Sequence, residues 1–63
     1  MIRVTRLNNK EFFVNAELIL YVEEKPDTII TLTNGEVFTV KESAEQVVER
    51  IIDYKRKILK EKK

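Results

Sequence analysis

The stretch TIITLTNGEVFTV, residues 28–40, decides the fold of this chain. The residues before Asn34-Gly35 are rich in β-branched side chains, which favour strands, and the residues after the pair continue in the same way. An Asn-Gly pair between two such segments predicts a hairpin, because a type I′ turn needs positive φ at both central residues. The sequence therefore predicts that residues 28–33 pair with residues 36–40 as antiparallel strands.

Three further short strands are predicted before this hairpin, at residues 2–7, 12–14 and 18–24. Asn8 and Asn9 tolerate positive φ and allow the chain to reverse between the first two strands. Residues 15–17 are polar at both ends and predict a kink or a single helical turn before the third strand. Pro26 and Asp27 end the third strand, because proline has no N–H for a ladder and presets a turn.

One amphipathic helix is predicted after the strands. Ser43 lies three residues before Gln46, which is the spacing of a capping box at a helix start. Apolar residues then recur every three or four positions and form one stripe: Val47, Ile51, Tyr54 and Ile58. Val48, Ile52 and Leu59 broaden this stripe to one face that we expect to be buried. Acidic residues recur on the other side, and we interpret them as a solvated face: Glu42, Glu45, Glu49 and Asp53. The fold class predicted is α+β, a small curved antiparallel sheet of about five short strands followed by one C-terminal amphipathic α-helix.

Length and charge limit the classes of function. The chain has 63 residues, with 12 Lys and Arg against 11 Asp and Glu, for a net charge of +1. A nucleic-acid-binding module usually carries a larger surplus or a concentrated basic face. No apolar run approaches the roughly 20 residues that span a bilayer, and no export segment is evident. We therefore expect a single domain over residues 1–63 in the cytoplasm, with no membrane insertion and no nucleic acid favoured as a partner.

The sequence is poor in groups that carry chemistry. It contains no His and no Cys, the residues that most readily supply proton transfer, thiol chemistry and transition-metal ligation near neutral pH. Ser43 is the only serine, and we interpret it as a helix cap, because no histidine is present to activate its hydroxyl. The carboxylates around Pro26 lack the spacing of a metal-binding loop. We therefore predict a protein that is not an enzyme, with no metal site and no cofactor.

Apolar residues fall on both faces of the predicted strands. Leu20 and Val22 share one face of the third strand, and Ile19 and Tyr21 share the other. A single helix is too short to cover both faces of such a sheet. The sheet therefore either closes into a small barrel or meets another subunit with its second face. Because a large exposed apolar patch usually marks a contact site, we expect a homo-oligomer.

A small RNA-binding regulator is the alternative function, because several short strands followed by one helix also describe small bacterial post-transcriptional regulators. Four aromatic residues can in principle stack on bases: Phe12, Phe13, Tyr21 and Phe38. Each of them lies within an apolar run, and no strand shows basic residues interleaved with aromatic ones. We therefore interpret the aromatic residues as part of the core.

Several segments, in order, carry a family resemblance. They are residues 1–8 (MIRVTRLN), 10–12 (KEF), 14–19 (VNAELI), 26–35 (PDTIITLTNG) and 40–43 (VKES) leading into Val47-Val48. Over nearly the whole chain this order resembles the FlbD family of small flagellar proteins. Asn9 stands where glycine is common in the family, and asparagine also tolerates the left-handed region that such a turn needs.

The resemblance implies a bacterial cytoplasmic protein that supports flagellar motility and swarming. The resemblance also implies that such a protein affects motor power by acting on the stator units, at the flagellar base on the inner membrane. No catalytic residue is defined in such a family. We predict that six polar residues, which core packing alone does not explain, are contact positions toward a second copy or a partner: Arg3, Arg6, Asn8, Asn15, Glu17 and Asp27.

Overall fold

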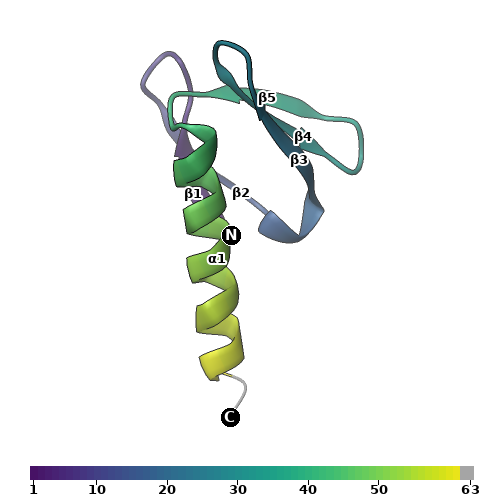
Figure 1. The fold of residues 1–63 in the computed structure, drawn as a ribbon, viewed down its shortest axis with the longest axis vertical. Helices are drawn as coiled ribbons and strands as arrows, with labels where there is room; N and C mark the ends of the chain where they lie inside the picture. Colours follow the sequence, from purple (N-terminus) through teal and green to yellow (C-terminus); the bar gives the residue numbers. More distant parts are fainter. Residues whose placement is uncertain (62–63) are drawn as a thin grey trace.

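A computed structural model describes residues 1–61 of the chain and the side chains of residues 1–59. The elements are β1 (Ile2–Thr5), β2 (Glu11–Val14), the 3₁₀ helix η1 (Ala16–Leu18), β3 (Ile19–Glu24), β4 (Thr28–Leu32), β5 (Val37–Val40) and α1 (Ala44–Glu61). All strand pairs are antiparallel, and α1 follows them and contacts β1 and β3 (Figure 1). The predicted α+β class is confirmed, including the helical turn before β3.

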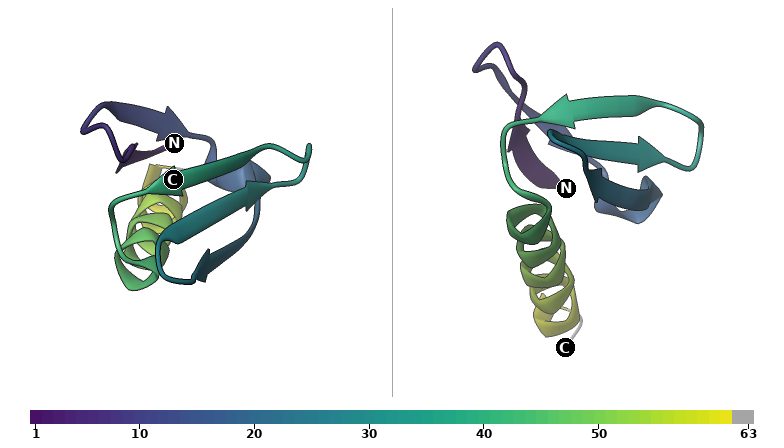
Figure 2. Two further views of the ribbon diagram at one scale, coloured as in Figure 1. Left: turned by 90° about the horizontal axis from the view of Figure 1, so that it is seen from above. Right: turned by 45° about the horizontal axis from the view of Figure 1, so that its top comes forward.

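The strands form two small sheets instead of the single curved sheet that the sequence suggested. One sheet pairs β1 with β2, and the other has the order β3-β4-β5. An isolated bridge between Arg6 and Val40 joins the end of β1 to the end of β5. Next to it, the N–H of Lys41 donates to the carbonyl of Thr5 at 2.8 Å. Because so few hydrogen bonds link the two sheets, they lie in different planes and enclose the core together with α1 (Figure 2).

The β4–β5 hairpin is confirmed, but its turn is not of type I′. Gly35 has a φ of +93°, whereas Asn34 does not have positive φ. The N–H of Leu32 donates to the carbonyl of Glu36 at 2.8 Å, which leaves a three-residue loop with glycine in its left-handed position. Asn34 acts through its side chain, since its Oδ1 accepts the N–H of Glu36 at 3.0 Å. This use of asparagine needs no positive φ at that residue.

Strand β3 contains an irregularity that changes which side chains face the core. Its register against β4 shifts between Ile19 and Tyr21, so Leu20 is an extra residue in the strand. Ile19 and Val22 therefore both pack against the core, and the strict alternation expected for this strand is wrong here. Leu20 and Tyr21 are consecutive and both exposed.

The core lies where α1 meets the two sheets. Its fully buried side chains come from four different elements: Val4, Ile30, Val40 and Val47. The predicted capping box is confirmed at the start of α1. Ser43 Oγ accepts the N–H of Gln46 at 3.1 Å, and Gln46 Oε1 accepts the N–H of Ser43 at 3.0 Å. The second half of α1 projects beyond the sheets (Figure 1).

Candidate functional site

Arg6 covers a pair of aromatic rings. Its guanidinium carbon lies 4.0 Å from the centre of the Phe12 ring and 5.4 Å from that of Phe38. The two ring centres are 5.2 Å apart. A guanidinium at this distance is attracted to the face of the ring, and its stem shields apolar surface. These two half-buried rings are therefore not free to stack on bases.

Asn8 and Asn15 shape the backbone of two separate loops. Asn8 Oδ1 accepts the N–H of Lys10 at 3.0 Å in the β1–β2 loop, where Asn9 has a φ of +72°. Asn15 Oδ1 accepts the N–H of Glu17 at 3.0 Å and caps η1. Asparagine forms such side-chain turns readily. Both residues thus have a local structural role, whatever else they contact.

Glu17 and Asp27 are exposed and lie beyond opposite ends of β3. Glu17 borders a shallow hollow with three residues of α1: Lys55, Ile58 and Leu59. The carbonyl of Asp27 accepts the N–H of Lys25 at 3.0 Å in the β3–β4 turn. The structure does not bring the six predicted contact residues into one site. Arg3 and Glu17 border two different hollows against α1.

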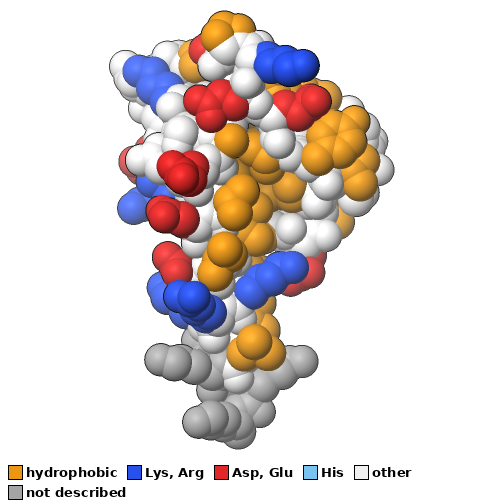
Figure 3. Space-filling model, in the orientation of Figure 1, with side chains coloured by type: hydrophobic (Ala, Val, Ile, Leu, Met, Phe, Trp, Pro, Cys, Tyr) orange, Lys and Arg blue, Asp and Glu red, His pale blue; other side chains and the backbone are white. Residues whose placement is uncertain are grey.

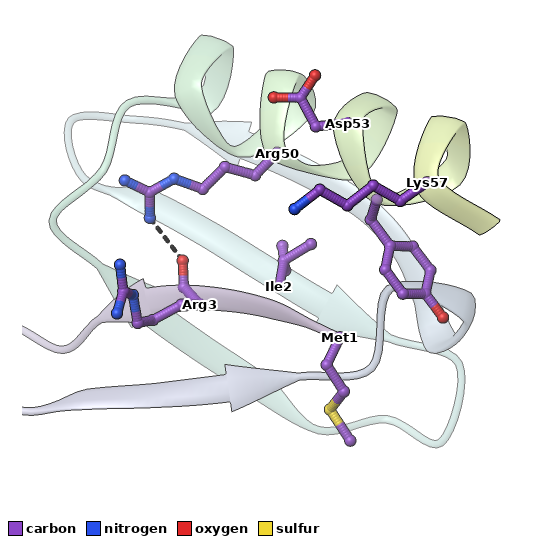
Figure 4. Close-up of a pocket in the computed structure, with 7 residues that line it drawn as sticks. Met1, Ile2, Arg3, Arg50, Asp53 and Lys57 are labelled. Carbon is purple, nitrogen blue, oxygen red and sulfur yellow. Dashed lines mark hydrogen bonds between the residues drawn. The ribbon is translucent and has the colours of Figure 1, made fainter. Parts of the chain in front are cut away.

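Arg3 lines a shallow pocket on one flank of α1, with a volume of about 260 Å³. The lining comes from the start of the chain and from α1: Met1, Ile2, Arg3, Arg50, Asp53, Tyr54 and Lys57. Figure 4 shows the Lys57 ammonium extended above Ile2, with the Asp53 carboxylate turned away from it. Among the side chains of residues 1–59, neither Arg3 nor Lys57 has a carboxylate within 4.0 Å. The pocket therefore combines available cations with apolar side chains.

A partly buried ion pair, Glu42 with Arg50, borders this pocket. Glu42 is only 8% exposed, so its assignment to a solvated face was wrong. Glu42 Oε1 accepts the N–H of Thr5 at 2.9 Å, and Oε2 accepts the Thr5 hydroxyl at 2.8 Å. Arg50 Nη1 donates to Glu42 Oε2 at 3.0 Å and to the carbonyl of Arg3 at 2.5 Å (Figure 4). These hydrogen bonds tie β1, the β5–α1 connection and α1 together.

The surroundings of Glu42 favour its charged form. Burial by itself would raise the pKa of this carboxyl. Hydrogen bonds from the N–H and hydroxyl of Thr5, from the backbone of Glu42 and from Arg50 outweigh burial and hold the pKa below its ordinary value of 4.5. The one signal in the sequence for this pair is the spacing of eight residues, close to two helical turns, between Glu42 and Arg50.

The opposite flank of α1 carries exposed apolar side chains. Val48 and Ile52 are each 45% exposed, and Leu59 is 70% exposed, so the prediction that these three side chains belong to the buried face of the helix was wrong. At 100° per residue these three side chains share one side of α1, about half a turn from Arg50 and Lys57. We refer to Val48, Ile52 and Leu59 as the apolar strip. Figure 3 shows apolar side chains running along α1 beside a row of charged ones.

The part of the chain that the structure describes offers no group of three or more Asp or Glu side chains placed to hold a metal ion. Glu24, one of the carboxylates near Pro26, instead accepts the N–H of Ala44 through Oε1 at 3.0 Å, at the start of α1. No helix within residues 1–61 is long and apolar enough to cross a membrane.

Comparison with known protein families gives one match. The FlbD family model, described as flagellar and swarming motility proteins, matches residues 1–59. No curated protein and no solved structure matches the chain. The family match covers every strand, the Arg3 pocket and the apolar strip, and it confirms the resemblance found in the sequence. The chain therefore belongs to the FlbD family, and its role is related to flagellar and swarming motility.

Proposed function

We propose that this protein is a non-enzymatic accessory of the bacterial flagellum that raises motor power through the stator units. It acts as an oligomeric adaptor in the cytoplasm, at the flagellar base on the inner membrane. The family match supports the link to motility, and the stator units are the point of action that the family resemblance implies. One observation supports the adaptor role above all. One flank of α1 borders the available cations Arg3 and Lys57, and the other flank carries exposed apolar side chains.

The Arg3 pocket is the proposed contact with a motor component. A carboxylate that reaches Arg3 or Lys57 at this pocket gains charge-assisted hydrogen bonds, which are stronger than neutral ones. The neighbouring Met1 side chain is exposed and offers apolar surface beside the two cations. The chemistry that fits this pocket is an acidic segment with an apolar side chain next to its carboxylate.

Motor torque measured separately from flagellar assembly tests this function. A strain that lacks the gene should still build hooks and filaments, but single motors should turn with lower torque and swarming should fail. Expression of the wild-type chain should restore both. The variant Arg3→Glu/Lys57→Glu should not restore torque, because two anions would then repel an acidic partner.

The matched control is Lys10→Glu/Lys25→Glu, which makes the same change of charge at exposed positions away from α1. It should restore torque fully. Loss of filaments in the deletion strain would contradict an action on the motor. Full torque with Arg3→Glu/Lys57→Glu would contradict the assignment of the pocket.

RNA binding is the contrasting outcome, because a regulator of motility genes would also alter swarming. Phe13 and Tyr21 are exposed, so their assignment to the core was wrong, but they lie in different sheets. Arg6 covers the other two aromatic rings. Purified protein should therefore leave the mobility of short RNA unchanged. Binding that weakens steeply with salt would favour the regulator, because contacts to phosphate release counterions.

A further inference from the structure

We infer that two copies of this chain associate through α1 in antiparallel orientation, with the apolar strip as the shared surface. The inference rests on the proposed oligomeric adaptor and deepens it, because it names the contacting residues and the orientation of the copies. Three observations carry it: the exposure of the strip, the projection of α1 and the order of charges along the helix.

The strip is apolar surface that the monomer leaves in water. Val48, Ile52 and Leu59 lie on one side of α1, while the buried stripe that begins at Val47 faces the sheets. Their spacing of four and seven residues is that of a helix–helix contact. The strip is therefore a second apolar face of α1, separate from the face that holds the fold together.

The shape of the molecule leaves room for a second helix. The second half of α1 extends beyond the sheets (Figure 1). An antiparallel partner can lay its own projecting half along the first half of α1, where Val48 and Ile52 lie. Helices in such contacts pack about 8–10 Å apart. Both copies cover the strip of the other in the same way, which gives a closed, two-fold symmetric dimer.

The order of charges along α1 selects the antiparallel orientation. Glu45 and Glu49 flank the first half of the strip, and Lys55 and Arg56 flank the second half; all four side chains are exposed. A parallel pair would place like charges opposite each other. An antiparallel pair places the acidic half of each helix against the basic half of the other, twice by symmetry. A second copy thus complements the strip in apolar character and in charge.

Exchange of charges tests this arrangement by sedimentation velocity at low salt. Glu45→Lys/Glu49→Lys makes both halves of the flank basic, and Lys55→Glu/Arg56→Glu makes both acidic. The wild-type chain should sediment as a dimer. Each variant alone should associate at least tenfold more weakly, and an equal mixture of the two should regain the dimer. Circular dichroism should show both variants folded, because the substituted side chains are exposed.

Two controls separate this contact from general effects of charge and of fold. Glu11→Lys/Glu23→Lys changes the net charge equally at exposed positions on β2 and β3 and should remain dimeric. Ile52→Asn removes apolar surface from the centre of the strip and should give a folded monomer. Dimers of undiminished affinity with Ile52→Asn, or with both charge variants alone, would overturn the inference.

The relative orientation of the two α1 helices is measured from the distance between nitroxide labels, one on each copy. The chain has no Cys, so Glu45→Cys supplies the only thiol. In an antiparallel pair centred on Ile52, the two labels should lie about 20 Å or more apart, because 14 residues separate the labelled positions along the axis at 1.5 Å each. A distance near 10 Å would indicate parallel helices and overturn the orientation. A wild-type monomer at high micromolar concentration would overturn the dimer, while torque in the deletion strain would still test the motor role independently.

Discussion

Replacement of Glu42 is the sharpest test of how this fold is held together. Glu42 accepts hydrogen bonds from the N–H and hydroxyl of Thr5 and from Arg50, and Arg50 also reaches the carbonyl of Arg3. Glu42→Gln keeps the size of the side chain and one acceptor oxygen, but it removes the charge and presents an NH₂ group to donors. Glu42→Ala removes all acceptors and leaves Thr5 with two donors near the core.

The expected loss of unfolding free energy follows from the hydrogen bonds that Glu42 makes. A hydrogen bond to a charged group contributes about 1.5–3 kcal/mol, and an unsatisfied buried donor costs about 1–3 kcal/mol. The Arg50 side chain is 42% exposed, so solvent screening reduces its ion pair with Glu42 to about 1 kcal/mol or less. We expect Glu42→Gln to lower the free energy of unfolding by about 2 kcal/mol and Glu42→Ala by about 3 kcal/mol. A domain of this length has roughly 3–9 kcal/mol in total, so the alanine variant should lose about a third or more of its stability.

Urea denaturation followed by circular dichroism measures this loss. The midpoint of unfolding should fall while the slope of free energy against urea stays constant. All variants must be compared at one protein concentration, because association would add stability by mass action. Glu23→Gln is the matched control, since Glu23 is exposed on β3 and should leave the midpoint unchanged. A Glu42→Gln midpoint equal to that of Glu23→Gln would refute the proposed role of the buried Glu42 carboxylate.

The Glu42 carboxylate should make the stability of the fold depend on pH, with higher stability above its pKa than below it. The pKa of Glu42 in the folded chain lies below 4.5, its ordinary value. The charged carboxylate therefore adds stability above that pH, and this contribution is lost as the pH falls through the folded pKa. The difference in unfolding free energy between the wild type and Glu42→Gln should be largest near neutral pH and shrink in acid. A difference that grows in acid would contradict the direction of the shift.

Substitutions at three further positions test local features, each by its urea midpoint. Ser43→Ala should cost about 1 kcal/mol by removing the capping hydroxyl of α1, and an unchanged midpoint would argue against the capping box. Gly35→Ala should cost about 1–2 kcal/mol because Gly35 has a φ of +93°; no atom lies within 4 Å of the added Cβ, so backbone strain is the whole cost. Gly35→Asn should cost less, because asparagine tolerates positive φ better than alanine. Equal losses from the two variants would contradict that reasoning. Arg6→Met keeps an apolar stem over Phe12 but removes the cation, so it should lose about 0.5–1 kcal/mol and less than Arg6→Ala.

Local sequence rules predicted the parts of the fold that depend on neighbouring residues. The β4–β5 hairpin follows from Asn34-Gly35, the start of α1 from Ser43 and Gln46, and the turn before β3 from Asn15. In each case the deciding hydrogen bonds join residues at most three positions apart, or four in the loop closed by Leu32 and Glu36. The residues next to each of these elements in the sequence are therefore enough to predict it.

The features that the sequence did not predict depend on distant contacts. Glu42 matches the helical period of the exposed acids, yet its hydrogen-bond partner Thr5 is 37 residues away. The register shift at Leu20 depends on how β3 meets β4. The two sheets are joined by the bridge from Arg6 to Val40 and by the hydrogen bond from Lys41 to Thr5, which connect residues more than 30 positions apart. Patterns within one segment carry no information about such pairings. The Arg3 pocket was missed for the same reason, because β1 and α1 form it together.

The surface of α1 has three sides with different contacts. One side packs on the sheets through Val47, a second side lines the Arg3 pocket, and a third side carries the apolar strip. In the proposed dimer the pocket lies about half a helical turn from the strip, so association leaves both pockets free. Two copies would then offer two sites to acidic segments of the motor, and a second contact made within one complex strengthens a weak first one without any new chemistry. Self-association and partner binding would thus reinforce each other, so a dimer of this small chain could bind the much larger motor more tightly than one copy does.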